Sequence, residues 1–219
     1  MTLIKAKDLI NSPIWKIEYF LSSKITAAAK RGSVVKLAEL VAIRKESFDP
    51  KKSSNEQVVY IGLENIEPIV GTIKKSKISK KNIEIKSISK KFYVGDIIFG
   101  RLRPTLNKIY YVETLDKDYG VCSNEFIVLI PNKDVVDSCF LRAILSSTEI
   151  QEMVNRYQSG STLPRIYVED LLSIDIPLPS LMKQRSIGKT LKSMTLKYLD
   201  IENAIQKLRN GFLDIQKII

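Results

Sequence analysis

Residues 176–219 read IPLPSLMKQRSIGKTLKSMTLKYLDIENAIQKLRNGFLDIQKII, and this stretch divides the chain into two parts. Pro177 and Pro179 favour an extended connector and oppose helix until they are passed. After them, apolar residues recur at alternating steps of four and three, which is the a/d spacing of a heptad seam. The seam consists of Ile187, Leu191, Met194, Tyr198, Ile201, Ile205, Leu208, Phe212, Ile215 and Ile219.

The spacing predicts one helix over 182–219, about 57 Å long at 1.5 Å per residue. Gly211 weakens it by only about 1 kcal/mol relative to alanine. A helix of this length exceeds what a compact domain needs, and each seam residue left in water forfeits about 1.5–3 kcal/mol of burial. We therefore expect a partner helix to cover the seam; the alternative is that the helix folds back onto its own body.

The preceding 181 residues predict a mixed α/β (α+β) domain, because short runs rich in Ile, Val, Tyr and Phe alternate with segments of helical spacing. Expected strands are QVVYIGL (57–63), DIIFGRL (96–102), NKIYYV (107–112) and EFIVLI (125–130). Expected helices are VVKLAELVAI (34–43), SCFLRAILSS (138–147), TEIQEMVNRY (148–157) and YVEDLLSI (167–174), with Asp137 and Thr148 as N-caps. The secondary-structure pattern of residues 1–33 is weaker, and we expect a helix or a loop packed against the domain.

The charge balance points to a polyanionic partner. The 219 residues carry 35 Lys and Arg against 24 Asp and Glu, which gives a net charge of +11. Such a surplus suits nucleic acid or an acidic membrane surface. No apolar run is long enough to span a bilayer and no signal peptide is recognisable, so we expect a cytoplasmic protein without a membrane partner. Two cysteines and no histidine predict neither a disulfide framework nor a metal site.

Most of the surplus lies in residues 70–108, which hold 11 Lys and Arg but only 2 Asp and Glu. Lysines interleave with isoleucines there, as on a strand or hairpin with one wet face. They predict a contact with DNA phosphates that gives affinity without sequence preference. The alternative is a solvated edge that uses lysine to resist aggregation. The lysines that we expect to make this contact are Lys74, Lys75, Lys77, Lys80, Lys81, Lys90 and Lys91.

Two further segments predict DNA contacts. In GDIIFGRLRPTLNKIYYV (95–112), Pro104 follows a buried strand and would hold the flanking Arg101, Arg103, Asn107 and Lys108 still. An arginine fork held in this way can bond guanine O6 and N7 together. The alternative is that the arginines pair with carboxylates from the acidic segment that follows.

The segment QSGSTLPRI (158–166) is a flexible, hydroxyl-rich turn. Ser159, Ser161 and Thr162 are expected to approach phosphates through side chains and backbone N–H groups, and Arg165 to add charge. The alternative is that the loop only orders the connection to the terminal helix.

The sequence lacks the motifs of nucleotide-binding enzymes and methyltransferases. It contains no phosphate-binding GxxxxGK[ST] loop, no methyltransferase motif and no glycine-rich dinucleotide turn. One fragment, Glu84-Ile85-Lys86, has the Glu-x-Lys pattern of magnesium-dependent nucleases. A nuclease thus stays an alternative to a DNA-binding protein that is not an enzyme.

Several blocks in order carry a resemblance: YIGLENIEP (60–68), GDIIFGRLRPTLNKI (95–109), GVCSNEF (120–126), QSGSTLPRI (158–166) and IPLPSLMKQRSI (176–187) before the long helix. From about Lys36 onward the chain resembles the DNA-specificity subunit of type I restriction-modification systems. The family usually joins two target recognition domains, each reading half of a split site, by two antiparallel helices. This sequence has one such domain (1–181) and one helix (182–219). The resemblance thus implies a half-length form, which as an antiparallel homodimer would read a palindromic split target.

The resemblance also implies a division of labour. A partner methyltransferase subunit would bring S-adenosylmethionine, and a restriction and translocation subunit would bring ATP and magnesium, so this chain would bind no cofactor. The other classes that stay open are the nuclease, a coiled-coil adaptor without DNA affinity, and a transcription regulator that binds DNA without a methyltransferase.

Overall fold

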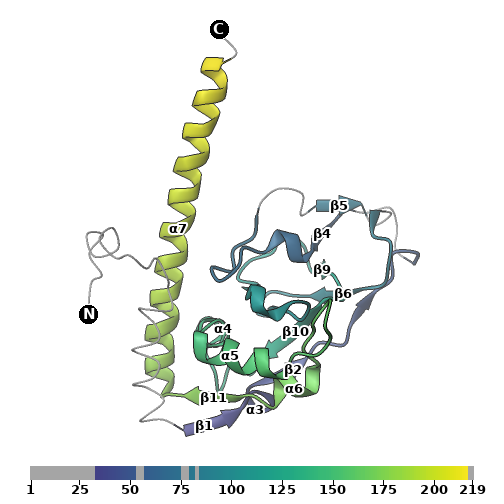
Figure 1. The fold of residues 1–219 in the computed structure, drawn as a ribbon, viewed down its shortest axis with the longest axis vertical. Coiled ribbons are helices and arrows are strands. Elements are labelled where there is room, and N and C mark those ends of the chain that lie inside the picture. Colours follow the sequence, from purple (N-terminus) through teal and green to yellow (C-terminus); the bar gives the residue numbers. More distant parts are fainter. Residues whose placement is uncertain (1–32, 53–56, 75–78, 82–83, 217–219) are drawn as a thin grey trace.

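The computed structural model describes residues 33–52, 57–74, 79–81 and 84–216. A mixed α/β lobe packs beside the lower part of one long helix, α7 (Leu181–Gln216), whose upper part projects past the lobe (Figure 1). The predicted fold class, a mixed α/β domain followed by a long C-terminal helix, is confirmed. Of the N-terminal segment 1–33, residues 1–32 lie outside the described residues, and Ser33 begins a strand.

A four-stranded antiparallel sheet with the order β2-β10-β7-β8 forms the centre of the lobe. Its central strand β10 is buried from Phe126 to Leu129, which explains the uninterrupted apolar run in the sequence. The strands are β2 (Val41–Ile43), β7 (Ile97–Gly100), β8 (Ile109–Tyr111) and β10 (Phe126–Pro131).

A second sheet of five strands has the order β3-β6-β9-β4-β5, with β4 and β9 parallel and the other pairs antiparallel. The lysine-bearing β5 lies at its edge, where a charged strand discourages pairing with other chains. The strands are β3 (Ser47–Phe48), β4 (Gln57–Ile61), β5 (Ser79–Lys81), β6 (Ser89–Phe92) and β9 (Gly120–Cys122). The 3-10 turn η1 (Leu63–Asn65) follows β4.

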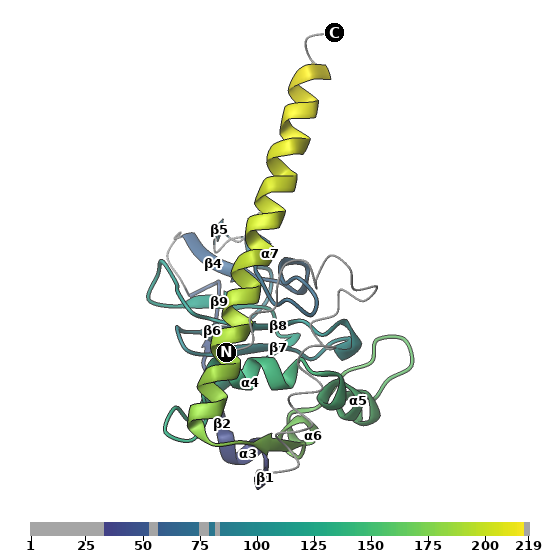
Figure 2. The same cartoon turned by 90° about the vertical axis from the view of Figure 1, so that its left-hand side faces the viewer.

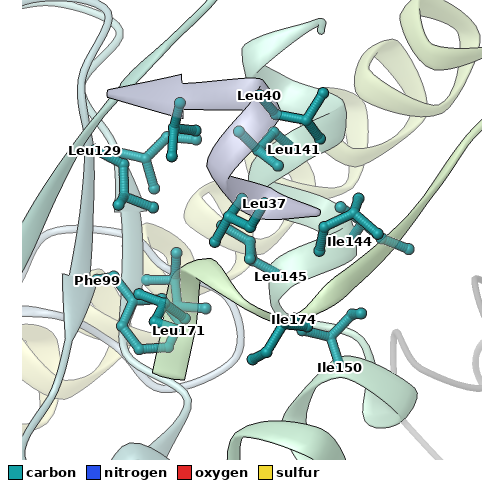
Figure 3. Packing of buried hydrophobic residues seen from close by; sticks show 14 of the residues in the cluster. Leu37, Leu40, Phe99, Leu129, Leu141, Ile144, Leu145, Ile150, Leu171 and Ile174 are labelled. Atoms are coloured by element: carbon teal, nitrogen blue, oxygen red, sulfur yellow. The ribbon is translucent and has the colours of Figure 1, made fainter. Parts of the chain in front are cut away.

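Four helices cover the four-stranded sheet and build the main core with it: α3 (Leu37–Leu40), α4 (Ser138–Leu145), α5 (Thr148–Tyr157) and α6 (Val168–Leu172). Their leucines and isoleucines interlock with Phe99 and Leu129 of the sheet (Figure 3). Beneath this core, β1 (Ser33–Lys36) pairs antiparallel with β11 (Asp175–Leu178), and β11 leads directly into α7. The described helices include none that is both long and apolar enough to cross a bilayer.

The four predicted strands are confirmed, but the predicted helix over 34–43 is wrong. Only Leu37–Leu40 is helical there; the flanking residues form β1 and β2. Val34 and Val35 pair with β11, and Val41 pairs with Pro131 of β10. β-branched residues favour strands, and available partner strands outweigh a helical spacing this short.

The helix N-caps are confirmed in one case and corrected in the other. Asp137 caps α4, because its carboxylate accepts a hydrogen bond from the Phe140 N–H at 2.9 Å. α5 is capped by Ser147, one residue before the predicted Thr148.

Candidate nucleic-acid interface

Two segments that lie about 60 residues apart in the sequence, GRLRP (100–104) and QSGSTLPRI (158–166), are joined by backbone hydrogen bonds. Leu102 and Arg165 form an antiparallel bridge. The Arg103 N–H donates to the Pro164 carbonyl at 2.7 Å, and the Ile166 N–H donates to the Arg101 carbonyl at 3.1 Å. The predicted arginines and the predicted hydroxyl loop therefore belong to one surface, which we call the Arg103 surface (residues 101–106 and 158–167).

The hydroxyl loop is closed at its base and open at its tip. Ser159 and Arg165 exchange two backbone hydrogen bonds of 2.8 Å each. Gly160 turns the chain with φ +98°, a conformation that suits glycine. Ser159, Ser161 and Thr162 are exposed, so their hydroxyl groups are accessible to a ligand.

Arg103 has an unusual backbone. Its φ of 46° and ψ of 61° place it in the left-handed region, at the N-terminus of the 3-10 turn η3 (Pro104–Leu106). A non-glycine residue there costs about 1–2 kcal/mol, and such strain concentrates at functional sites. The Arg103 side chain is exposed, and its guanidinium makes no hydrogen bond or ion pair with the described part of the chain. It is thus free to bind an external group.

Arg101 is held more firmly. Its backbone N–H donates to the Glu125 carbonyl at 2.9 Å, and its guanidinium lies 5.7 Å from the ring centre of Tyr167. Its Nε is buried without a hydrogen-bond partner among the described residues. Arg101 therefore has an anchored backbone and an unused donor.

Arg165 is paired within the lobe, so its charge is offset by a neighbouring carboxylate. Its Nη2 and Nε donate to the two carboxylate oxygens of Glu125 at 2.6 and 2.9 Å, and its Nη1 reaches the Leu163 carbonyl at 3.2 Å. This bidentate pair joins the hydroxyl loop to the residue before β10. The predicted pairing of arginine with the acidic segment thus occurs, but at Arg165.

The pair predicts a pH dependence of loop order. The hydrogen bonds from Arg165 hold the pKa of Glu125 below its ordinary value of 4.5. A carboxyl with a depressed pKa stabilises the fold above its unfolded pKa, and this contribution is lost as pH falls through the lower folded pKa. In NMR spectra, the Arg165 Hε signal should therefore persist at pH 4.5 and disappear only below it. Loss of the signal above pH 4.5 would contradict this ion pair.

Three of the residues predicted to contact DNA make hydrogen bonds inside the lobe. The Lys90 ammonium donates to the Phe126 carbonyl and that of Lys108 to the Leu63 carbonyl, each at 2.6 Å, and burial lowers the pKa of both. Asn107 is only 6% exposed, and its Nδ2 donates to the Ser146 carbonyl at 2.9 Å. These polar groups hold loops in place, because buried donors need acceptors.

The other lysines differ in availability. Lys81 is exposed on β5; Lys74 is exposed but paired with Glu67 at 2.8 Å. The Lys91 ammonium lies 4.2 Å from the ring centre of Tyr119. The positions of Lys75 and Lys77 and the side chain of Lys80 fall outside what the structure describes.

Sequence reasoning missed Glu125, which anchors the hydroxyl loop, and Tyr167, which is 53% exposed beside Arg101. Leu106 and Leu163 are also exposed, at 42% and 44%, on the two joined loops. In the sequence, Tyr167 is marked only by its position directly after QSGSTLPRI (158–166). Exposed apolar groups around an arginine suit contact with base faces and thymine methyl groups.

The heptad seam divides into a docked half and an exposed half. Leu191 is 5% exposed in the main core and Ile187 packs against that core, so these two are not free for a partner helix. Met194 and Tyr198 are half-buried. Ile201, Ile205, Leu208 and Phe212 are 45–68% exposed. The side chain of Ile215 and all of Ile219 lie outside the described residues.

Within the described ranges, no group of three or more Asp, Glu or Cys side chains is arranged to hold a metal ion. Glu84 and Lys86, the nuclease-like pair, are both exposed on the surface near β6.

Comparison with known proteins shows the family of the chain. Residues 31–208 match the family model of the type I restriction modification DNA specificity domain. The type I restriction enzyme EcoDI specificity subunit of Escherichia coli is 28% identical over 131 residues, covering 58% of this chain and 28% of that protein. The HsdS subunit of Thermoanaerobacter tengcongensis superposes with a TM-score of 0.65 at 27% identity, covering 78% of this chain and 44% of the other.

A further solved chain, from work on complex assembly and conformational transition of the type I R-M system, superposes with a TM-score of 0.66 at 26% identity. That match covers 83% of this chain and 46% of the other. This chain therefore spans less than half the length of these relatives. The resemblance that the ordered sequence blocks predict is confirmed, and the chain belongs to the family of type I restriction-modification DNA specificity domains.

Proposed function

We propose that this chain reads duplex DNA for a type I restriction-modification complex and performs no chemistry itself. One observation carries the proposal most directly: the backbone bonds that join Arg103 and the hydroxyl loop into one exposed surface. A rigid scaffold that presents an unpaired arginine beside hydroxyl groups is what base and phosphate recognition require.

Within this surface the roles are divided. Arg103, with its free guanidinium, contacts a base edge, and Arg101 with Tyr167 lies beside it as a second contact. Ser159, Ser161 and Thr162 bind phosphates and set the register. Lys81 and the other exposed lysines of 70–108 add affinity that does not depend on sequence.

The domains are likewise divided: residues 1–181 recognise DNA, and the part of the helix 182–219 that extends beyond the lobe pairs two copies. The exposed half of α7 packs antiparallel against the same helix of a second copy, which places two recognition domains on one palindromic split target. A methyltransferase subunit brings S-adenosylmethionine and a restriction subunit brings ATP and magnesium. The complex acts in the cytoplasm.

The test is co-expression with a type I methyltransferase subunit from the same genome, followed by mapping of methylated DNA. We expect the two proteins to purify together and methylation to appear at a palindromic split motif only when this chain is present. Cleavage by the purified chain alone in magnesium, abolished in Glu84→Gln, would show a nuclease instead. DNA binding with no methyltransferase association would show a regulator.

Replacing Arg103 by alanine should relax sequence preference. A bidentate arginine contact is worth about 1–3 kcal/mol of discrimination, so affinity for the mapped target should fall about 5- to 150-fold while affinity for unrelated DNA barely changes. Lys81→Ala is the control, with a small loss on every sequence and a lower salt slope. Fluorescence anisotropy on both DNAs measures this. Equal losses from Arg103→Ala on both would remove its base-reading role.

A further inference from the structure

The start of α7 is locked onto the start of α4 by a buried glutamine. Gln184 is 1% exposed. Its Oε1 accepts a hydrogen bond from the Asp137 N–H at 2.9 Å, and its Nε2 donates to the Pro179 carbonyl at 2.8 Å. Asp137 is also the N-cap of α4, so one residue connects the two helix starts.

One helical turn further on, Gly188 faces α4 with no room for a side chain. A Cβ added there would lie 2.7 Å from Asp137 Oδ1, 2.9 Å from Cys139 Cβ and 3.3 Å from the Phe140 nitrogen. Distances below 3.0 Å require something to shift, and the Cys139 Cβ is fixed to the α4 backbone. A larger residue at 188 therefore requires α7 and α4 to shift relative to one another, by more as the side chain grows.

Beyond this contact α7 extends past the lobe, so a small change of its angle would move its far end by a larger distance (Figure 2). Beyond the half-buried Leu199, every residue from 200 to 213 is exposed. From Gly188 to Phe212 the helix extends roughly 36 Å at 1.5 Å per residue. A tilt of about 10° at the joint would displace the far end by roughly 6 Å, which is about two base-pair steps of 3.4 Å.

We propose that the joint made by Gln184, Gly188 and Asp137 sets the angle between the recognition domain and the rod, and through it the spacing of the two DNA half-sites. The effect on DNA rests on the proposed dimeric function; the effect on the angle does not. Gly188 acts as a positioning residue, because it touches α4 and no part of the Arg103 surface.

The matched control is Gly211, the other glycine of α7, since a Cβ added there meets nothing within 4 Å. Both residues lie in the same helix and both gain the same methyl group on substitution. We therefore compare three variants: Gly188→Ala, Gly188→Leu and Gly211→Ala. Gly211→Ala shows the effect of a change in helix propensity alone, and the Gly188 variants add the effect of the contact with α4.

The first measurement is an intrachain distance. Lys117 and Arg209 are both exposed, and each is replaced by an unnatural amino acid with a ketone group that takes a spin label. Pulsed electron paramagnetic resonance then measures the distance between the lobe and the far part of α7. Labelled protein is diluted into excess unlabelled protein, so that only intrachain pairs contribute. We expect Gly188→Leu to shift or broaden the distance by several ångströms, Gly188→Ala to do so less, and Gly211→Ala to leave it unchanged.

The second measurement uses palindromic DNA built from the mapped half-site, with the spacer varied one base pair at a time. Gly188→Leu should move or broaden the preferred spacer by one or more base pairs while affinity for a single half-site stays unchanged. If the distance between the labels at 117 and 209 is unchanged in a folded Gly188→Leu variant, the proposal is wrong. If Gly188→Leu does not fold, the same distance in Gly188→Ala is the test. A shifted distance with an unchanged spacer optimum would overturn its DNA part, whereas a shifted distance with no dimer or no DNA binding would refute the proposed function instead.

Discussion

Leu208→Glu is expected to convert the protein from a dimer to a monomer. Leu208 lies on the exposed half of the α7 seam and is 65% exposed in the single chain. In a twofold dimer the substitution occurs twice, and each lost leucine burial costs about 1.5–3 kcal/mol. The dimer dissociation constant should therefore rise by roughly 100-fold to 10,000-fold. Sedimentation velocity over a concentration series measures the change.

Leu196→Glu is the matched control. Leu196 is 54% exposed on the same helix, but it lies on the side opposite the seam. It should leave the dimer intact. If Leu208→Glu stays dimeric, or if Leu196→Glu disrupts the dimer equally, the seam is not the interface between copies.

The monomer should also separate two contributions to DNA binding. Leu208→Glu leaves the Arg103 surface untouched, so affinity for a single half-site should stay at the wild-type level. Affinity for the full palindrome should fall to about that of one half-site, because the second domain no longer binds at a high effective concentration.

Arg142→Ala is expected to destabilise the lobe by about 3–5 kcal/mol. Arg142 is 4% exposed in α4, and burial lowers its pKa to about 10. Its Nη2 donates to the Ile69 carbonyl at 2.6 Å and its Nε to the Ile109 carbonyl at 3.3 Å, with no carboxylate partner among the described residues. Alanine would leave both carbonyls unpaired beside a cavity. Chemical denaturation measures the loss.

The surface residue Arg156→Ala is the control for Arg142 and should change stability by no more than about 0.5 kcal/mol. Arg142→Met keeps most of the volume and removes the buried charge, so its cost should be smaller, about 1–3 kcal/mol. An Arg142→Ala variant as stable as the wild type would show that the two carbonyls find other partners.

Gly71 belongs to the same network and explains why the sequence needs glycine there. Its φ is +65°, and an added Cβ would lie 2.1 Å from both the Ile109 carbonyl oxygen and Arg142 Nη2. The neighbouring Ile69 N–H donates to the Asn107 carbonyl, next to the Arg103 turn. Arg142 thus supports the turn that presents Arg103, although it lies outside the Arg103 surface.

The long helix and the central strands were predictable from the sequence because their signals are local and repeated. The seam of α7 repeats over several heptads, and the run in β10 is apolar without interruption. Residues 34–43 were mistaken for a helix because their strands form only by pairing with β10 and β11, which lie far away in the chain.

The sequence does not show which charged side chains face water, because a lysine or arginine reads the same whether its charged group is solvated or bonded to a backbone carbonyl. Lys90 and Lys108 counted toward the basic segment, yet both ammonium groups bond to backbone oxygens. Arg165 and Arg103 looked alike in sequence, but Glu125 neutralises the first and leaves the second free.

By itself the sequence determined the two-part architecture, the strands of the sheet centre and the family, because periodicity and ordered blocks are properties of the chain alone. Only the tertiary structure decided which cations are available, that two distant loops share one surface, and that Gln184 and Gly188 hold the rod against α4. The physical reason is that hydrogen bonds and close approaches between distant segments depend on where the folded chain places their atoms, which no local pattern encodes.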